Sequence, residues 1–379
     1  MKNYSRYITI GVVLLLLGII FYYFSNIVTY VSIAWVLSMV GLPIRDLLMH
    51  IRIGKYRFGA TAAAILTMIC FMGFFAAMFA LLVPPIVDQV QNLTNVDYNN
   101  VEKSLSQPLK QLTDLGHKYG FVPRGKTAME QFQTFFKGQV TTEGLTSVFN
   151  TVLSTATTLF AGLVAVMFIT FFFLQDQSLF VGFMTSVVPA RHDDRVRDTI
   201  DDIRTMLTRY LGGILLQMFI VSTVLSILLW SFGSKNVLLM AVLYGLFNVI
   251  PYLGPIIGAS LGLLITLSSN LDQDFYAYTW PLLLKVFLAY PIIQMLDGFF
   301  IQPYIFSKRV LAHPLEIFIV ILIGADLFGP LGMILAVPTY TIIRVIARTF
   351  FSQYRFVQKL TETLDNELED DKSGEKEGL

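Results

Sequence analysis

Two long apolar stretches, each interrupted by proline and glycine, constrain the fold of this chain more than any other feature. They cover residues 237–269 and 317–349, and each is 33 residues long. A helix of that length would extend roughly 50 Å, against a hydrocarbon core about 30 Å thick. Each stretch is therefore too long for one ordinary membrane span and too short for two.

The interruptions lie near the middle of both stretches. In the first they are Asn248, Pro251, Gly254, Pro255 and Gly258, and in the second they are Gly324, Asp326, Gly329, Pro330, Gly332 and Pro338. Proline lacks a backbone donor and glycine relaxes the helix, so amides and carbonyls are left unpaired at a depth where lipid cannot bond to them. Paired broken segments of this kind are typical of substrate sites in secondary transporters.

Composition places the chain among polytopic membrane proteins, because 55% of its residues are hydrophobic and only 14% are charged. The net charge of +1 gives no electrostatic reason to expect nucleic acid as a partner. The single cysteine, Cys70, lies in an apolar run, which excludes a disulfide framework and a thiolate metal site. We expect no cofactor, no metal and no enzymatic activity.

Six apolar runs predict about six full spans, at 8–24, 27–44, 60–83, 152–174, 211–230 and 281–306. The first follows Lys2 and Arg6, as in a signal peptide, but no small-residue cleavage motif comes after it, so we expect a retained helix. The basic loop 45–58 is predicted to be cytoplasmic, and the region 88–150 to lie on the opposite side. An amphipathic helix at 191–210 is expected along the cytoplasmic membrane surface.

The same charge rule orients the two broken stretches. The loop 270–280 has acidic residues but no lysine or arginine, whereas the second stretch runs between the basic loop 308–313 and Arg344 and Arg348. The first stretch is then a re-entrant hairpin from the outside, and the second is its inverted partner from the cytoplasm. Two kinked helices, or two pairs of short spans, are the alternative.

The expected fold class is therefore an all-α polytopic membrane protein, with about six full spans plus two broken re-entrant hairpins in an inverted-repeat arrangement. Residues 1–87 would form N-terminal membrane helices, 88–150 an extracytoplasmic helical region, 151–350 the transport core and 351–379 an acidic cytoplasmic tail. Both termini would then be cytoplasmic.

Three ordered motifs carry a resemblance to a known family. They are NVIPYLGPIIGA at 248–259, QPYIFSKRVLAHPLE at 302–316 and GADLFGPLGMILAVP at 324–338. With these motifs the chain resembles the autoinducer-2 exporter family of bacterial permeases, over 32–348. The resemblance implies a homo-oligomeric transporter of the bacterial inner membrane. Some members are assigned to a quorum-sensing furanone and others to sodium or lithium exchange for protons, so the solute stays open. Many relatives carry Glu-Asn where this chain has Asp297 and Gly298, which puts a cation-binding role of that dipeptide in doubt here.

Ionisable groups at membrane depth need a reason, because each costs roughly 2.5 to 3.5 kcal/mol on insertion scales. Asp297 and Asp326 could relay protons or cations, or could be structural acids that cap broken helices. Buried amides such as Gln217 and Gln294 could line a polar path or could only join helices. The predicted transport path consists of Asn248, Pro251, Tyr252, Gly254, Pro255, Gly258, Asp297, Gln302, Asp326, Gly329, Pro330 and Gly332. Alanine at Gly254 or Gly329 is expected to leave insertion intact while lowering transport.

The segment GFVPRGKT at 120–127 fits the phosphate-binding P-loop pattern. A P-loop follows a buried strand, whereas the segment before this one is polar and helix-like, so we do not expect it to bind a nucleotide.

The leading hypothesis is a secondary transporter that exports a small polar solute, similar to autoinducer-2, or exchanges monovalent cations for protons. The alternative is a passive channel or membrane scaffold. The lipid bilayer is the expected surrounding in either case.

Overall fold

The computed structural model describes residues 23–53, 56–94, 113–114, 142–188, 192–271, 273–306, 313–359 and 361. The predicted first span at 8–24 lies almost wholly outside these residues, as do most of the region 88–150, the P-loop-like segment at 120–127 and most of the acidic tail.

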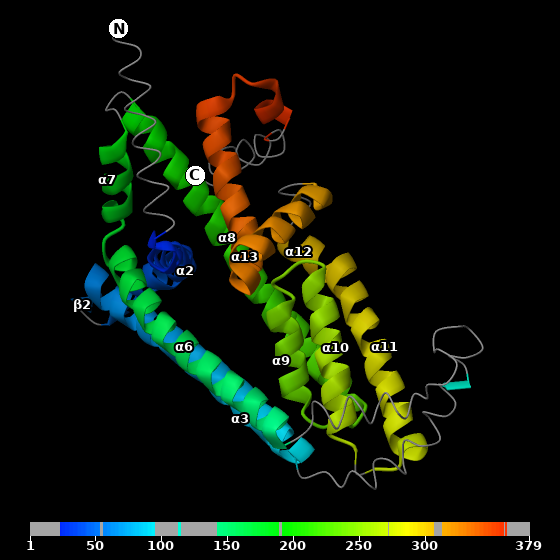
Figure 1. Cartoon of the computed structure of the whole chain (residues 1–379). Helices are drawn as coiled ribbons and strands as arrows, with labels where there is room; N and C mark the ends of the chain where they lie inside the picture. The colour runs from blue at the N-terminus through cyan, green and yellow to red at the C-terminus, as the bar shows by residue number, and fades with distance from the viewer. Residues whose placement is uncertain are drawn as a thin grey trace. The chain divides into compact units, whose positions relative to one another are not determined.

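The described chain is helical apart from one very short β-ladder (Figure 1). Its elements are α2 (Ser25–His50), β1 (Arg52–Ile53), β2 (Tyr56–Arg57), α3 (Ala60–Thr94), α6 (Thr142–Gln175), α7 (Ser178–Val187), α8 (Asp193–Ser231), α9 (Val237–Phe247), α10 (Leu253–Ser268), η2 (Phe275–Thr279), α11 (Trp280–Leu296), η3 (Asp297–Ile301), α12 (Gln302–Phe306) and α13 (Pro314–Phe351). The all-α prediction is thus confirmed with one correction: β1 and β2 pair antiparallel, Arg52 opposite Arg57, within the predicted loop 45–58.

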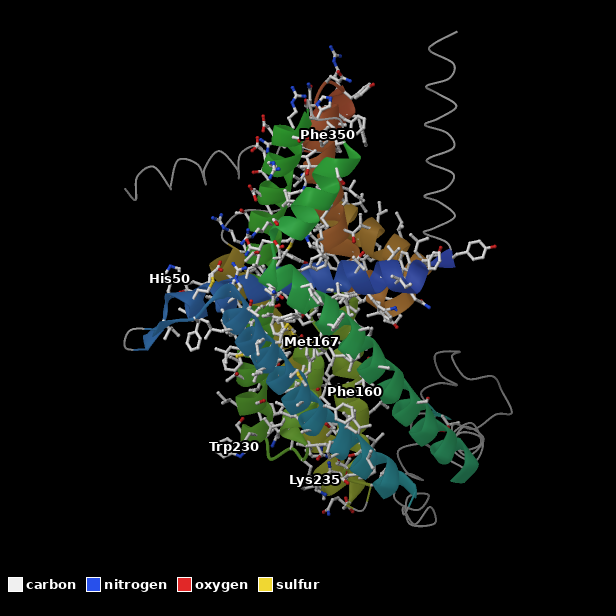
Figure 2. The ribbon with its side chains drawn as sticks, turned by 90° about the vertical axis from the view of Figure 1, so that its left-hand side faces the viewer. His50, Phe160, Met167, Trp230, Lys235 and Phe350 are labelled. Atoms are coloured by element: carbon white, nitrogen blue, oxygen red, sulfur yellow. The ribbon has the colours of Figure 1, made fainter. Side chains whose placement is uncertain are left out.

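Five described helical segments are long and apolar enough to cross a bilayer. They are Asn26–His50, Ala60–Gln89, Asp193–Ser231, Phe275–Phe306 and Pro314–Phe351. Shorter apolar helices occupy Phe160–Gln175, Val237–Phe247 and Leu253–Ser268. Many large apolar side chains on them are exposed, as Phe219 is at 71% and Trp230 at 77%. Helices that leave such groups uncovered are suited to lipid rather than water. Figure 2 shows Trp230 and Lys235 at the end of α8 that finishes at Ser231.

The chain divides into two units that are discontinuous in sequence. Unit 1 consists of Met1–Met72, Thr157–Arg209 and Pro338–Leu379, and unit 2 consists of Gly73–Ala156 and Tyr210–Val337.

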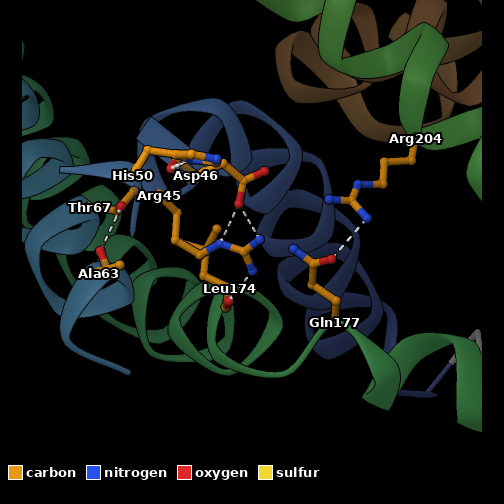
Figure 3. Close-up of polar contacts among 8 residues, drawn as sticks. All are labelled: Arg45, Asp46, His50, Ala63, Thr67, Leu174, Gln177 and Arg204. Atoms are coloured by element: carbon orange, nitrogen blue, oxygen red, sulfur yellow. Dashed lines mark hydrogen bonds and ion pairs between the residues drawn. The ribbon is translucent and has the colours of Figure 1, made fainter. Parts of the chain in front are cut away.

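Unit 1 contains a buried, paired arginine. Arg45 is 6% exposed, and its guanidinium forms a salt bridge with Asp46 and donates a 2.8 Å hydrogen bond to the carbonyl of Leu174 (Figure 3). Leu174 is in the last turn of α6, where unpaired carbonyls attract a cation. Arg45 was predicted to begin a loop, but α2 continues to His50, so this arginine is part of the helix.

The predicted amphipathic helix is the first part of α8, which continues without a break into the predicted span. Four apolar residues recur on one face of this part of the helix, and all of them are buried: Val196, Ile200, Ile203 and Leu207. On this helix Arg204 donates a hydrogen bond of 2.9 Å to Gln177 of unit 1 (Figure 3). The apolar face is therefore confirmed, and its position on a membrane surface stays a prediction.

Candidate functional site

The first broken stretch forms a helical hairpin within unit 2. Helices α9 and α10 pack against each other and α10 also packs against α11 (Figure 1). Between α9 and α10 the backbone is irregular at 248–252, and Tyr252 takes a positive φ of 66°. The Gly254 amide donates to the Ile250 carbonyl at 2.9 Å, which closes the turn. The sequence prediction of a break at this position is confirmed.

Glycines allow the two arms of this hairpin to approach closely. A Cβ built on Gly254 would lie 1.8 Å from the carbonyl oxygen of Phe247, and one on Gly258 would lie 2.9 Å from the Cα of Tyr244. Both contacts involve backbone, which cannot give way as a flexible side chain can. A methyl group added at Gly254 would therefore force the two arms apart locally. That Gly254→Ala leaves insertion intact while lowering transport stays a prediction.

A second irregular segment faces this turn. The regular helix α11 ends at Leu296, and residues Asp297–Ile301 form the π-helical turn η3 before α12 begins. Short π-helical segments widen a helix locally and are frequent at functional sites. Asp297 is the first residue of this turn, and its side chain is buried, with the residue only 1% exposed.

The carboxylate of Asp297 is surrounded by amide side chains from three other parts of unit 2. Gln217 of α8 donates to both of its oxygens, at 2.9 and 2.8 Å. Asn248, from the hairpin turn, donates to Oδ2 at 3.2 Å, and Gln302 of α12 donates to Oδ2 at 2.9 Å. We call these four residues the carboxylate cluster.

The electrostatics of the carboxylate cluster are unusual for a buried charge. Buried carboxylates are normally paired with a cation, because burial removes the water that stabilises the charge. Here the described residues provide no ion pair to Asp297, and its partners are neutral amide donors. Such an amide can rotate to present its oxygen instead of its nitrogen. The cluster can therefore donate to a bare carboxylate or accept from a proton or cation that binds there.

Two tyrosines extend the polar groups away from Asp297. Tyr244 of α9 donates a 2.8 Å hydrogen bond to Gln294 of α11, which is three residues before Asp297. The Tyr244 and Tyr290 rings are 5.3 Å apart between centroids. Both tyrosines lie within the main apolar core of unit 2, together with leucines and valines of α8, α9 and α11.

The second broken stretch also reverses the chain direction. Within α13, Gly329 has φ 61° and ψ −143°, a conformation open essentially only to glycine. A Cβ built on Gly332 would lie 1.9 Å from the carbonyl oxygen of Gly324, eight residues earlier. In a straight helix, residues eight apart are about 12 Å apart. The arms before and after Gly329 therefore fold back on each other.

The turn of the first hairpin packs against both arms of the second hairpin inside unit 2. Ile250, in the first break, packs in one buried cluster with Ile321 and Ala336, one from each arm of the second hairpin. The rings of Tyr252 and Phe318 also contact edge to face, with centroids 6.0 Å apart. The irregular turn of the first hairpin thus contacts the second broken stretch and also supplies Asn248 to the carboxylate cluster, as expected for a site built beside half-helices.

The structure brings together only some of the twelve predicted path residues. Asn248 and Gln302 each donate a hydrogen bond to Asp297. Pro251, Tyr252, Gly254, Pro255 and Gly258 form the first hairpin's turn and the start of α10, and Gly329, Pro330 and Gly332 form the second hairpin's turn. Asp326 is exposed, and within the described residues no hydrogen bond links it to the carboxylate cluster.

The predicted path did not include the buried tyrosines Tyr244 and Tyr290. It also lacked Gln217 and Gln294, which the sequence indicated only as amides that could line a polar path or join helices. Tyr290, Gln294 and Asp297 recur at spacings of four and three, and Tyr244 and Asn248 at a spacing of four, so each set lies on one helix face. That periodicity of polar groups in apolar helices was available as a signal. Gln217, which donates twice to Asp297, lies 80 residues from it along the chain.

In the part of the chain that the structure describes, no group of three or more histidine, cysteine, aspartate or glutamate side chains comes together. The donor set at Asp297 is one carboxylate with three amides. Oxygen donors of this kind suit hard cations rather than soft transition metals.

Comparisons with known proteins agree with this architecture. The model of the AI-2E family transporter matches residues 10–352. YueF of Bacillus subtilis, named for transport, is 28% identical over 301 residues, 78% of each chain. YrrI of the same organism, also named for transport, is 30% identical over 218 residues, 58% of each chain. PerM of Escherichia coli K12, named as a permease, is 29% identical over 187 residues, 48% of this chain and 50% of that protein.

The match to the family model covers nearly the whole chain, and the described apolar helices have the length and composition of membrane spans. This multi-pass membrane protein therefore belongs to the AI-2E transporter family.

Proposed function

We propose that this protein is a secondary transporter of the bacterial inner membrane, and that Asp297 is the group whose protonation or cation binding drives transport. It exports a small polar solute, similar to autoinducer-2, or exchanges monovalent cations for protons. The observation that carries the proposal is the burial of Asp297 among amides alone, beside two broken helices.

The chemistry of the carboxylate cluster supports this role. An ionised Asp297 accepts four hydrogen bonds, one at Oδ1 and three at Oδ2. Adding a proton turns one acceptor into a donor, so at least one amide must rotate or move away. Because Gln217, Asn248 and Gln302 belong to different elements, such a movement alters the packing between α8, the first hairpin and α12. Occupancy of the site is thereby coupled to the shape of the core.

The proposed membrane arrangement follows the charge pattern. Both termini are cytoplasmic, the first hairpin enters from the outside, and the second enters from the cytoplasm. The two hairpins then give the core two nearly equivalent states, open to opposite sides. The protein works as a homo-oligomer in this proposal.

Flux in proteoliposomes that contain the pH dye pyranine tests the proposal. With an imposed pH gradient, pulses of sodium or lithium chloride should move protons through the wild type, and Asp297→Asn should abolish this movement. To test solute export, the flux of labelled polar metabolites is measured with and without the pH gradient. Flux that ignores the gradient and survives Asp297→Asn would instead indicate a passive channel.

Cysteine labelling tests the membrane arrangement, after Cys70 is changed to Ser. Lys235→Cys and Asp274→Cys, on exposed residues at the two ends of the first hairpin region, should both react with an impermeant maleimide from outside. His313→Cys and Ser352→Cys, also at exposed positions, should react only from inside. Labelling of the first pair from different sides would contradict a re-entrant first hairpin.

A further inference from the structure

A buried tyrosine hydroxyl in the core of unit 2 has no hydrogen-bond partner. Tyr290 is 4% exposed, and within the described structure its hydroxyl contacts no donor or acceptor. The hydroxyl lies against Gly262 of α10, where a Cβ would come within 1.6 Å of it. A buried polar atom left unpaired costs about 1 to 3 kcal/mol, and phenylalanine would fill the same space without that cost. The hydroxyl therefore needs a functional reason.

A second unpaired atom lies further along the same hairpin. Asn270, directly after the first broken stretch, is 1% exposed, and its Oδ1 has no partner among the described residues. Its Nδ2 donates to the carbonyl of Thr266 at 2.8 Å, and its own carbonyl accepts from Thr279 at 3.2 Å. Ser269 and Lys235 lie beside it and are joined by a 2.9 Å hydrogen bond at the exposed end of the hairpin.

These atoms belong to one line of polar groups through an apolar core. Gly262, Thr266 and Asn270 recur every four residues on α10 and its end, and Tyr290, Gln294 and Asp297 recur on the facing α11 and η3. The polar file, as we call it, runs from the exposed end of the hairpin to the carboxylate cluster. Its members are Asn270, Thr266, Tyr290, Tyr244, Gln294 and Asp297.

We infer that the polar file is a proton path, which connects the exposed end of the hairpin, beside the buried Asn270, to Asp297. The inference rests on the proposed function, since it supplies the proton that Asp297 would bind. Water molecules beside the unpaired oxygens of Asn270 and Tyr290 bridge the gaps, as buried waters do at unsatisfied polar groups.

The transfer balances without any redox step. One proton enters from water at the Asn270 end. Each hydroxyl or water on the way accepts one proton and releases another to its neighbour, and Tyr290 and Tyr244 end as they began. The amides of Asn270 and Gln294 orient the bridging water and do not carry the proton themselves. The carboxylate of Asp297 becomes a carboxylic acid, and the exposed end has given up one proton to the site.

The surroundings of Asp297 let the path end there. Toward it, α9 presents Tyr244, α11 presents Gln294, and α8, the hairpin turn and α12 present the amides Gln217, Asn248 and Gln302. Helix α10 contains no aspartate, glutamate, histidine, lysine or arginine. Asp297 is thus the first carboxylate that a proton meets along the described file.

Removing single hydroxyls tests the path in the full-length protein. Tyr290→Phe deletes only the unpaired hydroxyl, and Thr266→Val deletes a second hydroxyl of the file, which donates to the Gly262 carbonyl. Proton entry into pyranine-loaded vesicles is driven by a potassium–valinomycin potential, which requires no knowledge of the solute. Both variants should lower Asp297-dependent entry about tenfold or more, as expected for a lost proton-transfer group.

Matched controls separate a lost path from a disturbed fold. Tyr304→Phe removes a hydroxyl from a residue that is 84% exposed, and Thr223→Val removes one from an exposed threonine that also bonds four residues back. Vesicles that contain either control variant should take up protons at the wild-type rate. If Tyr290→Phe and Thr266→Val also match the wild type while Asp297→Asn does not, the path is wrong and the proposed function stands. If Asp297→Asn itself conducts protons normally, the proposed role of Asp297 fails.

Discussion

The two units of this protein each bury a charged side chain, and they treat it in opposite ways. In unit 1, Arg45 is surrounded by opposite charge: the carboxylate of Asp46 and a carbonyl at the end of α6 (Figure 3). In unit 2, Asp297 has only neutral amides around it. The helices that contact Arg45 are regular, whereas Asp297 lies in a π-helical turn and is bonded to the irregular turn of the first hairpin.

The difference indicates what each charge is for. A paired charge at a helix end is already neutralised, so binding a further ion there gains nothing, and its role is to hold α2 against α6. An unpaired carboxylate has a free-energy reason to bind a proton or cation. Broken backbone beside it allows the surrounding helices to respond. We therefore expect mutations in unit 1 to act through stability and those at the carboxylate cluster to act through transport.

The largest expected effect comes from Asp297→Asn. Asparagine keeps the size of the side chain but cannot become ionised, so coupled flux should fall about a hundredfold or more. The midpoint of thermal unfolding should fall little or rise, since a buried unpaired charge is removed. Flux in vesicles and unfolding in detergent measure the two effects separately. A loss of flux that only follows a loss of folded protein would make Asp297 a structural residue like Arg45.

Arg45→Met should show the reverse pattern. Methionine retains the apolar stem but leaves Asp46 and the Leu174 carbonyl without their donor, which costs about 1 to 3 kcal/mol of unfolding free energy. The figure is modest because the Asp46 side chain is 41% exposed and keeps contact with water. Transport per folded molecule should stay at the wild-type level. A selective loss of transport with unchanged stability would overturn the distinction between the units.

Gly329→Ala tests whether the broken backbone of unit 2 matters as much as its charge. Alanine is strained at φ 61° and ψ −143°, at a cost of about 1 to 3 kcal/mol, although no atom lies within 4 Å of the added Cβ. The chain turn should weaken and transport should fall. Gly212→Ala, in α8 with open space around its Cβ, is the control and should behave as the wild type. Equal behaviour of the two variants would show that the turn is not needed.

The sequence allowed Asp297 to be predicted as a site residue because an acid in an apolar run is conspicuous. The positions of both breaks were equally visible, since proline and glycine have local effects. Asp326 carried the same signal, yet it is exposed, because the sequence does not show which way a helix face turns. Gln217 could not be assigned to Asp297, since the contact depends on how α8 packs against η3. Tyr290 was not predicted as a site residue, because tyrosine is common in membrane helices.

Gly298→Asn should have the smallest effect on transport. It tests whether the residue next to Asp297 belongs to the carboxylate cluster. The family resemblance implies an amide beside the acid, which puts a cation-binding role of Asp297 in doubt when its neighbour is glycine. In the structure Gly298 is exposed and a Cβ there would meet nothing within 4 Å, so this position does not face the carboxylate cluster. The amides that Asp297 uses come from Gln217, Asn248 and Gln302 instead. We expect Gly298→Asn and Gly298→Ala to leave flux per folded molecule unaltered, since a side chain at this position does not face the carboxylate cluster. A large gain of flux with asparagine but not alanine would mean that the neighbouring amide belongs to the site, and that the cluster described here lacks one of its donors.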